Sequence, residues 1–109
     1  MFFDFFIETD DPEEAKEIAY NKLSILNVSN IILDKNKKYW KIESLYHVEI
    51  YVNEKIKAAD FQNFLDDIAY DWEAGDPRYL TASQTSYKIK ENNEKIYMVN
   101  IFREPEEIK

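Results

Sequence analysis

The chain has 109 residues, of which 33% are charged and 16% are aromatic, and its formal net charge is −8. So many aromatic residues predict one folded domain with a single core and exclude a disordered chain. The absence of cysteine excludes disulfides, thiolate zinc sites and a cysteine nucleophile, and the single glycine excludes glycine-rich phosphate loops.

The first predicted element is a strand over residues 2–8. Phe3, Phe5 and Ile7 alternate with residues that include Asp4 and Glu8, and a period of two is typical of a strand. Two further phenylalanines on the second face indicate an interior strand. Because the acids interrupt the apolar run, we expect neither a signal peptide nor a membrane span. We therefore expect a cytoplasmic protein.

A helix is predicted directly after this strand. Asp11 can accept hydrogen bonds as the N-cap, Pro12 suits the first helical position, and Glu14 completes a capping box. Apolar residues follow at helical spacing as far as Leu26, and Asn27 can end the helix.

The next segment predicts two strands joined by a polar turn. Residues 28–33 have strand composition, residues 34–38 are rich in lysine and resemble a turn, and residues 39–52 alternate over an unusual length. We expect a bulge or break near Ser44, and we place Trp40 on the buried face.

The clearest pattern is a second helix. Asp60 or a neighbour is the predicted N-cap, and Gly75 is the predicted left-handed stop. One narrow arc of the helix carries the predicted core residues Phe61, Phe64, Leu65, Ile68 and Trp72.

The last third predicts a hairpin with strands at 85–89 and 96–101. We therefore expect one α+β domain over residues 1–103 and a frayed acidic tail over 104–109. The order is β-α-β-β-α-β-β: a mainly antiparallel sheet of about five strands, with two helices on one face. This is the ferredoxin-like order plus an extra strand.

Acidic residues gather on and after the second helix. Residues 58–87 contain six acids and one arginine, so the outer helix face lacks the mixed charge of an ordinary solvated face. Such a surface can steer a basic partner, with Tyr70 as an anchor; the plainer interpretation is a solubilising face. The predicted partner-binding residues are Asp60, Asn63, Asp66, Asp67, Tyr70, Asp71, Glu73, Asp76 and Tyr79.

No catalytic motif is present, and we expect no cofactor and no metal. His47 is the only histidine, and no second histidine or cysteine exists to complete a common transition-metal site. The lysines of 35–41, with their neighbouring aromatics, are better explained by a solvated turn than by direct nucleic-acid binding.

The function that these features predict is that of a small acidic binding protein, not an enzyme. It would inhibit a basic protein, such as a nuclease toxin or another nucleic-acid-handling enzyme, by occupancy. In size and charge the chain is similar to immunity proteins of bacterial toxin systems and to small phage inhibitors, without a shared motif. The alternative is a module that forms a homodimer or binds a small ligand through aromatic residues on the open sheet face: Tyr39, Tyr51 and Tyr97.

Overall fold

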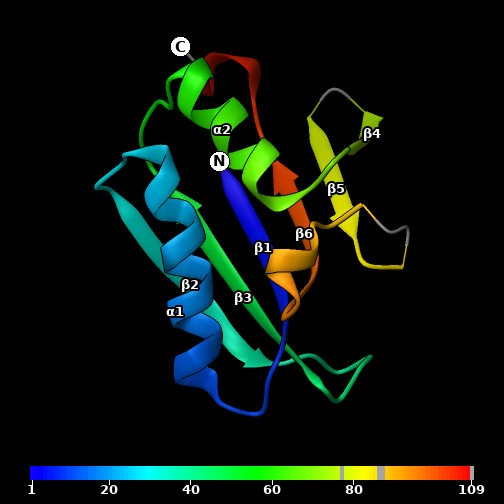
Figure 1. Cartoon of the computed structure of the whole chain (residues 1–109). Helices are drawn as coiled ribbons and strands as arrows, with labels where there is room; N and C mark the ends of the chain where they lie inside the picture. Colours follow the sequence, from blue (N-terminus) through cyan, green and yellow to red (C-terminus); the bar gives the residue numbers. More distant parts are fainter. Residues whose placement is uncertain (77, 86–87, 109) are drawn as a thin grey trace.

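A computed structural model describes residues 1–76, 78–85 and 88–108, without the side chains of residues 76 and 105. Two α-helices, α1 (Pro12–Leu23) and α2 (Ala58–Ile68), accompany three short 3₁₀ turns, η1 (Ser24–Leu26), η2 (Glu91–Asn93) and η3 (Pro105–Glu107) (Figure 1). The strands are β1 (Phe2–Glu8), β2 (Ile31–Lys38), β3 (Leu45–Val52), β4 (Glu73–Asp76), β5 (Tyr79–Ser83) and β6 (Ile96–Phe102).

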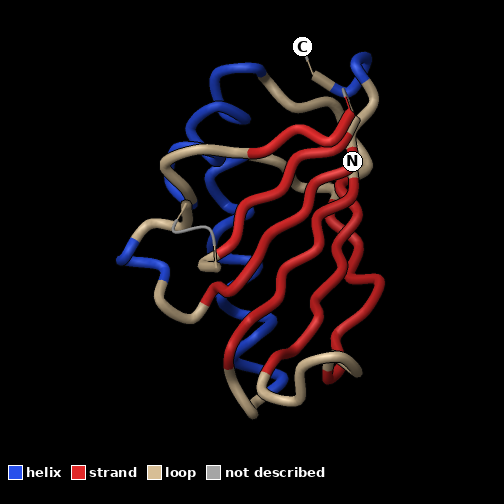
Figure 2. Tube along the Cα trace, turned by 90° about the vertical axis from the view of Figure 1, so that its right-hand side faces the viewer, coloured by secondary structure: helices blue, strands red, loops and turns tan. Residues whose placement is uncertain are grey.

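All six strands form one antiparallel sheet in the order β2-β3-β1-β6-β5-β4. Both α-helices lie on the same face of this sheet, and none of the described residues forms an α-helix on the other face (Figure 2). The predicted α+β class is therefore confirmed, with six strands instead of about five. The ferredoxin-like order is matched only roughly, because the β4–β5 hairpin precedes β6 and extends the sheet beyond it.

The N-terminal third follows its sequence signals closely. The Asp11 side chain caps α1 by accepting a hydrogen bond of 3.0 Å from the Glu13 amide. Asn27 ends the helical segment with a φ of 54°, the left-handed conformation that asparagine tolerates better than most residues. The predicted N-cap and helix end are both confirmed.

The core lies between the sheet and the helices. Phe3, Phe5 and Ile7 are fully buried on the helix-facing side of β1. The ring of Phe64, from α2, meets those of Phe3 and Phe5 edge-on, at centroid distances of 5.2 and 6.4 Å. Edge-to-face packing adds to the burial of apolar area, so these rings hold α2 against the central strand.

The polar turn predicted at 34–38 is wrong, because these residues continue β2. An edge strand with one solvent-facing side accommodates lysines that resemble a turn in the sequence. The actual connection is 39–44, so the predicted long strand 39–52 begins only at Leu45. Trp40, assigned to the core by alternation, lies in this connection and is 83% exposed.

Helix α2 ends at Ile68, well before Gly75, because other groups satisfy its last carbonyls. The side chain of Asn93 donates hydrogen bonds to the carbonyls of Asp67 and Ile68, at 2.9 and 3.1 Å. The Trp72 indole nitrogen donates to the Leu65 carbonyl at 3.0 Å. Trp72 thus packs against the core as expected, but from the chain that follows the helix.

Two predictions for the C-terminal half differ from the structure. The segment around Gly75, predicted as the left-handed stop of the second helix, instead forms β4 and pairs with β5, and the φ of Gly75 is not positive. Strand 85–89 is not formed in its described part: Ile89 makes only an isolated bridge to Ala69, and Tyr87 lies outside the described residues. Near the C-terminal end of the described residues, Ile108 forms a bridge to Ile56, and the Ile56 amide donates to the Glu107 carbonyl at 2.8 Å.

The cap at the end of α2 generates the first testable prediction. Asn93 is 4% exposed, and Asn93→Ala removes its amide donor from the Asp67 and Ile68 carbonyls, of which that of Ile68 keeps a hydrogen bond from the Lys90 amide. We expect a loss of about 2 kcal/mol in the free energy of unfolding, measured by urea denaturation. The control is Asn92→Ala, since Asn92 is exposed and its loss should change stability by less than about 0.5 kcal/mol. Equal stability of the two variants would contradict the capping role.

Candidate functional site

The predicted acidic surface is divided among several elements. Because α2 ends at Ile68, the helical geometry used to place residues beyond it does not apply. Tyr70 and Asp71 lie in the connection to β4, and Tyr79 lies in β5. For Asp76 only the backbone is described, in β4. The remaining members are Asp60, Asn63, Asp66 and Asp67 on α2, and Glu73 in β4.

Cations from distant parts of the chain neutralise part of this surface. The ammonium group of Lys22, on α1, pairs with Asp67 at 2.8 Å, and that of Lys88 pairs with Glu73 at 2.6 Å. Neither pair can be recognised from local spacing, because the two partners of each pair are far apart in sequence. The acidic surface that is left without ion pairs in the structure is therefore smaller than the sequence predicts.

Two acids of this surface remain exposed: Asp66 on α2, and Asp71, which follows Tyr70 in the connection to β4. Both aspartates are exposed, and neither forms an ion pair with a described residue. Asp66 accepts a hydrogen bond of 2.9 Å from Gln62. The Tyr70 side chain is 63% exposed, with the Lys90 ammonium 5.4 Å from its ring centre.

Tyr70 is itself engaged locally. Its hydroxyl donates a hydrogen bond to the Glu91 carboxylate. This bond raises the pKa of Tyr70 above its usual value and lowers the pKa of Glu91, because it stabilises the phenol and the carboxylate together.

The second surface lies on the open face of the sheet. One row of side chains crosses five adjacent strands, and each member is the register partner of the next. Alternation along the strands directs these side chains away from the helices. We call these residues the apolar row: Ile32, Tyr51, Phe2, Phe102 and Tyr79.

The apolar row is substantially exposed. Ile32, Phe2 and Phe102 keep 49%, 42% and 46% of their surface accessible to solvent. Ring contacts join Phe2 to Tyr51 at a centroid distance of 4.7 Å and Tyr79 to Phe102 at 4.8 Å. A concavity of about 530 Å³ adjoins the row, between Phe2, Tyr51 and Phe102 and the segment around Arg103 and Glu104.

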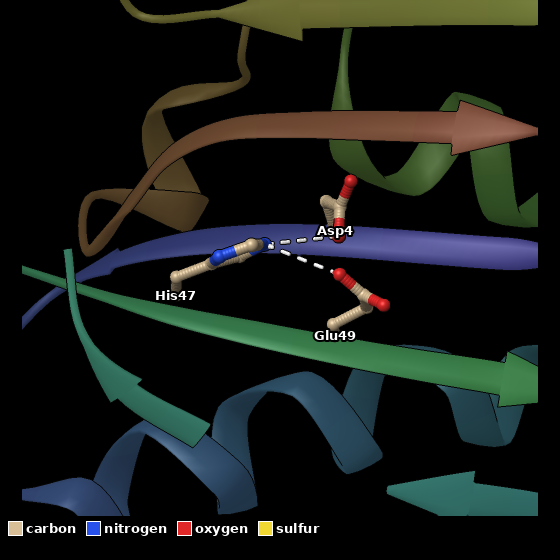
Figure 3. Close-up of side chains that lie close together, drawn as sticks. All are labelled: Asp4, His47 and Glu49. Carbon is tan, nitrogen blue, oxygen red and sulfur yellow. Dashed lines mark hydrogen bonds and ion pairs between the residues drawn. The ribbon is translucent and has the colours of Figure 1, made fainter. Parts of the chain in front are cut away.

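Next to the apolar row, Asp4, His47 and Glu49 meet on the same face (Figure 3). The His47 Nε2 atom lies 2.9 Å from an Asp4 carboxylate oxygen and 3.9 Å from a Glu49 oxygen. All three side chains are half-buried. We call these residues the Asp4–His47–Glu49 cluster.

The cluster contains an electrostatic conflict. Asp4 on β1 and Glu49 on β3 are direct register partners, an arrangement that disfavours two like charges. Burial raises the pKa of Glu49, assisted by contact with the Asp34 carboxyl group and by the negative charge of Asp4, while Lys35 opposes these effects. A site of this kind can hold a cation.

Sequence reasoning missed this cluster because it depends on strand register. His47 and Glu49 share a strand face by simple alternation, but nothing local indicates that Asp4 lies opposite Glu49. Of the aromatics expected on this face, Tyr51 belongs to the apolar row, and Tyr39 packs on Phe6 with ring centres 4.8 Å apart. Tyr97 lies at the irregularity between β1 and β6 and makes no ring contact with a described residue.

Comparisons with protein-family models, with curated proteins and with solved structures found no match. None of the helices in the described part of the chain has the length and apolar character needed to cross a membrane.

The hydrogen bond between Tyr70 and Glu91 generates the second prediction. Glu91→Gln should bring the pKa of Tyr70 down toward its ordinary value near 10, because the accepting group loses its charge. The measurement is a pH titration followed by NMR of the Tyr70 ring. Glu94→Gln, a neighbouring exposed acid, is the control and should leave the titration unchanged. An unchanged Tyr70 titration in the Glu91 variant would show that the phenol is free of this carboxylate.

Proposed function

We propose that this chain is a small acidic binding protein that docks a basic protein partner through the open face of its sheet and acts by occupancy. The supporting observation is the apolar row, which crosses five strands and in which Ile32, Phe2 and Phe102 are exposed while Tyr51 and Tyr79 are half-buried. Contiguous exposed apolar surface is uncommon on a monomer and is typical of an interaction site.

The apolar row has the character of an interface centre. Aromatic side chains bring a large apolar area at a small cost in rotamer entropy, and such residues carry much of the free energy of many interfaces. Phe2 and Phe102 lie at the middle of the row, on neighbouring strands, so a partner seated there would contact both. The adjoining concavity can receive a side chain of that partner.

Charge favours a basic partner. The chain carries −8, and a field of this sign accelerates the approach of a positively charged surface. Asp66, Asp71 and Tyr70 are also exposed, and their negative charges and phenol can contribute to steering or to the rim of the interface.

The alternative is a homodimer with the open faces packed on each other, as sheets pack in sandwiches. It has the same apolar row in its favour. Against it, two copies would each bring a charge of −8, and the Asp4 and Glu49 carboxylates lie beside the row in both. A basic partner carries charge opposite to that of this chain, whereas a second copy carries charge of the same sign.

The third prediction tests the apolar row. The double variant Phe2→Thr/Phe102→Thr keeps β-forming residues and removes the two central rings. Immobilised wild-type protein and variants are exposed to lysate of the native host, and captured proteins are quantified by mass spectrometry. We expect a basic protein to be captured by the wild type and its capture by the double variant to fall about tenfold or more.

The matched control for this experiment is Trp40→Thr, which removes a highly exposed aromatic outside the apolar row and should leave capture intact. Capture of the same protein by the double variant would overturn the assignment of the open face. A wild-type protein that is dimeric in light scattering at both low and high salt, and captures no basic protein, would favour the homodimer.

The fourth prediction concerns steering. Asp66→Lys/Asp71→Lys reverses two exposed charges without breaking the Lys22–Asp67 pair. We expect a several-fold slower association with the captured partner at low salt and a smaller difference at high salt, measured by surface plasmon resonance. Equal association rates for wild type and variant at low salt would remove this surface from the docking pathway.

A further inference from the structure

We propose that Asp4, His47 and Glu49 form a binding site for one divalent transition-metal ion, with Zn²⁺ as the best match to their donor atoms. This site is independent of the partner's identity and adds a ligand to the open face. The inference stands on the geometry of the three side chains, on their charges, and on the rigidity of the strands that carry them.

The three donor atoms already lie close to coordinating positions. One imidazole nitrogen and two carboxylate oxygens lie within 4.8 Å of one another. Tetrahedral Zn²⁺ holds such ligands at about 2.0–2.2 Å, which separates them by roughly 3.3–3.6 Å. The present distances from His47 Nε2, 2.9 Å to Asp4 and 3.9 Å to Glu49, bracket that separation. Small side-chain rotations are therefore enough to surround an ion.

The charges of the cluster favour a cation from outside the chain. Asp4 and Glu49 face each other across neighbouring strands, and no lysine or arginine among the described residues pairs with either of them. Lys35 is the register partner of Glu49 but forms no ion pair with it. A cation bound between the two carboxylates would remove the repulsion.

His47 is held in place by its packing. Its ring stacks on Phe6 with centroids 4.6 Å apart and an interplanar angle of 7°, and Tyr39 approaches from a second side at 6.0 Å. β1 and β3 are interior strands, so the ligands project from a firm part of the sheet. With three protein ligands, a tetrahedral ion has one position left for water or for a group from another molecule.

The donor set selects the class of metal. Mg²⁺ and Ca²⁺ prefer all-oxygen sites with more ligands, whereas an imidazole nitrogen combined with carboxylates suits Zn²⁺ and related transition ions. A simple ion pair of His47 with Asp4 is the competing explanation, and in that case Glu49 contributes nothing to metal affinity.

The fifth prediction is tested on full-length protein freed of metal by chelation. Isothermal titration with ZnCl₂ should show one saturable equivalent, with a raised thermal midpoint, and MgCl₂ should produce neither effect. Long-range ¹H–¹⁵N NMR should show that the ion perturbs Nε2 of His47 more than Nδ1. This last measurement needs no variant, so it does not depend on how substitutions affect folding.

The variants for this test are Asp4→Asn, His47→Gln and Glu49→Gln, each checked by circular dichroism for native secondary structure. We expect each to weaken Zn²⁺ binding by about tenfold or more. Glu8→Gln is the control, because Glu8 is an exposed acid farther along β1 and should not contribute. Unchanged affinity in Glu49→Gln, equal binding of Mg²⁺, or no saturable Zn²⁺ binding by the wild type would each overturn the site.

Discussion

The structure depends above all on the pairing of β1 with β3 on one side and β6 on the other. Side chains alternate along a strand, so the register of this central strand decides which residues enter the core and which reach solvent. Phe3, Phe5 and Ile7 are directed to the helices by that register, while Phe2 and Asp4 are directed to the open face. A shift of one residue would exchange the two sets, and strong burial on one side makes the register specific.

The parts of the fold that were predicted well are those controlled by local chemistry. Asp11 begins α1, and Asn27 ends η1, which follows it, because capping and left-handed backbone are properties of single residues in their immediate context. The strand at 2–8 was predictable because Phe3, Phe5 and Ile7 recur with a period of two. By contrast, the lysines of β2 resembled a turn, since the position of a strand at a sheet edge is a tertiary property. The end of α2 was equally hidden, because its carbonyls are satisfied by Asn93, from far along the chain.

The candidate sites show the same division between local and distant information. The acids near α2 are visible in the sequence, and Asp66 and Asp71 do remain exposed. Their neighbours Asp67 and Glu73 are paired with Lys22 and Lys88, which only the tertiary fold brings near. The apolar row and the Asp4–His47–Glu49 cluster both require knowledge of which residues are opposite each other on neighbouring strands. Alternation within β3 could suggest that His47 and Glu49 share a face. It could not show that Asp4, on the neighbouring strand β1, lies opposite Glu49.

The two edges of the sheet have a consequence for how this molecule can assemble. β2 presents lysines along one border, and the opposite border is formed by β4, which has only four residues. Charged or very short border strands discourage backbone hydrogen bonding between separate molecules, the first step toward ordered fibrils. Such protection allows the molecule to keep hydrophobic side chains exposed on its flat side without polymerising through its margins.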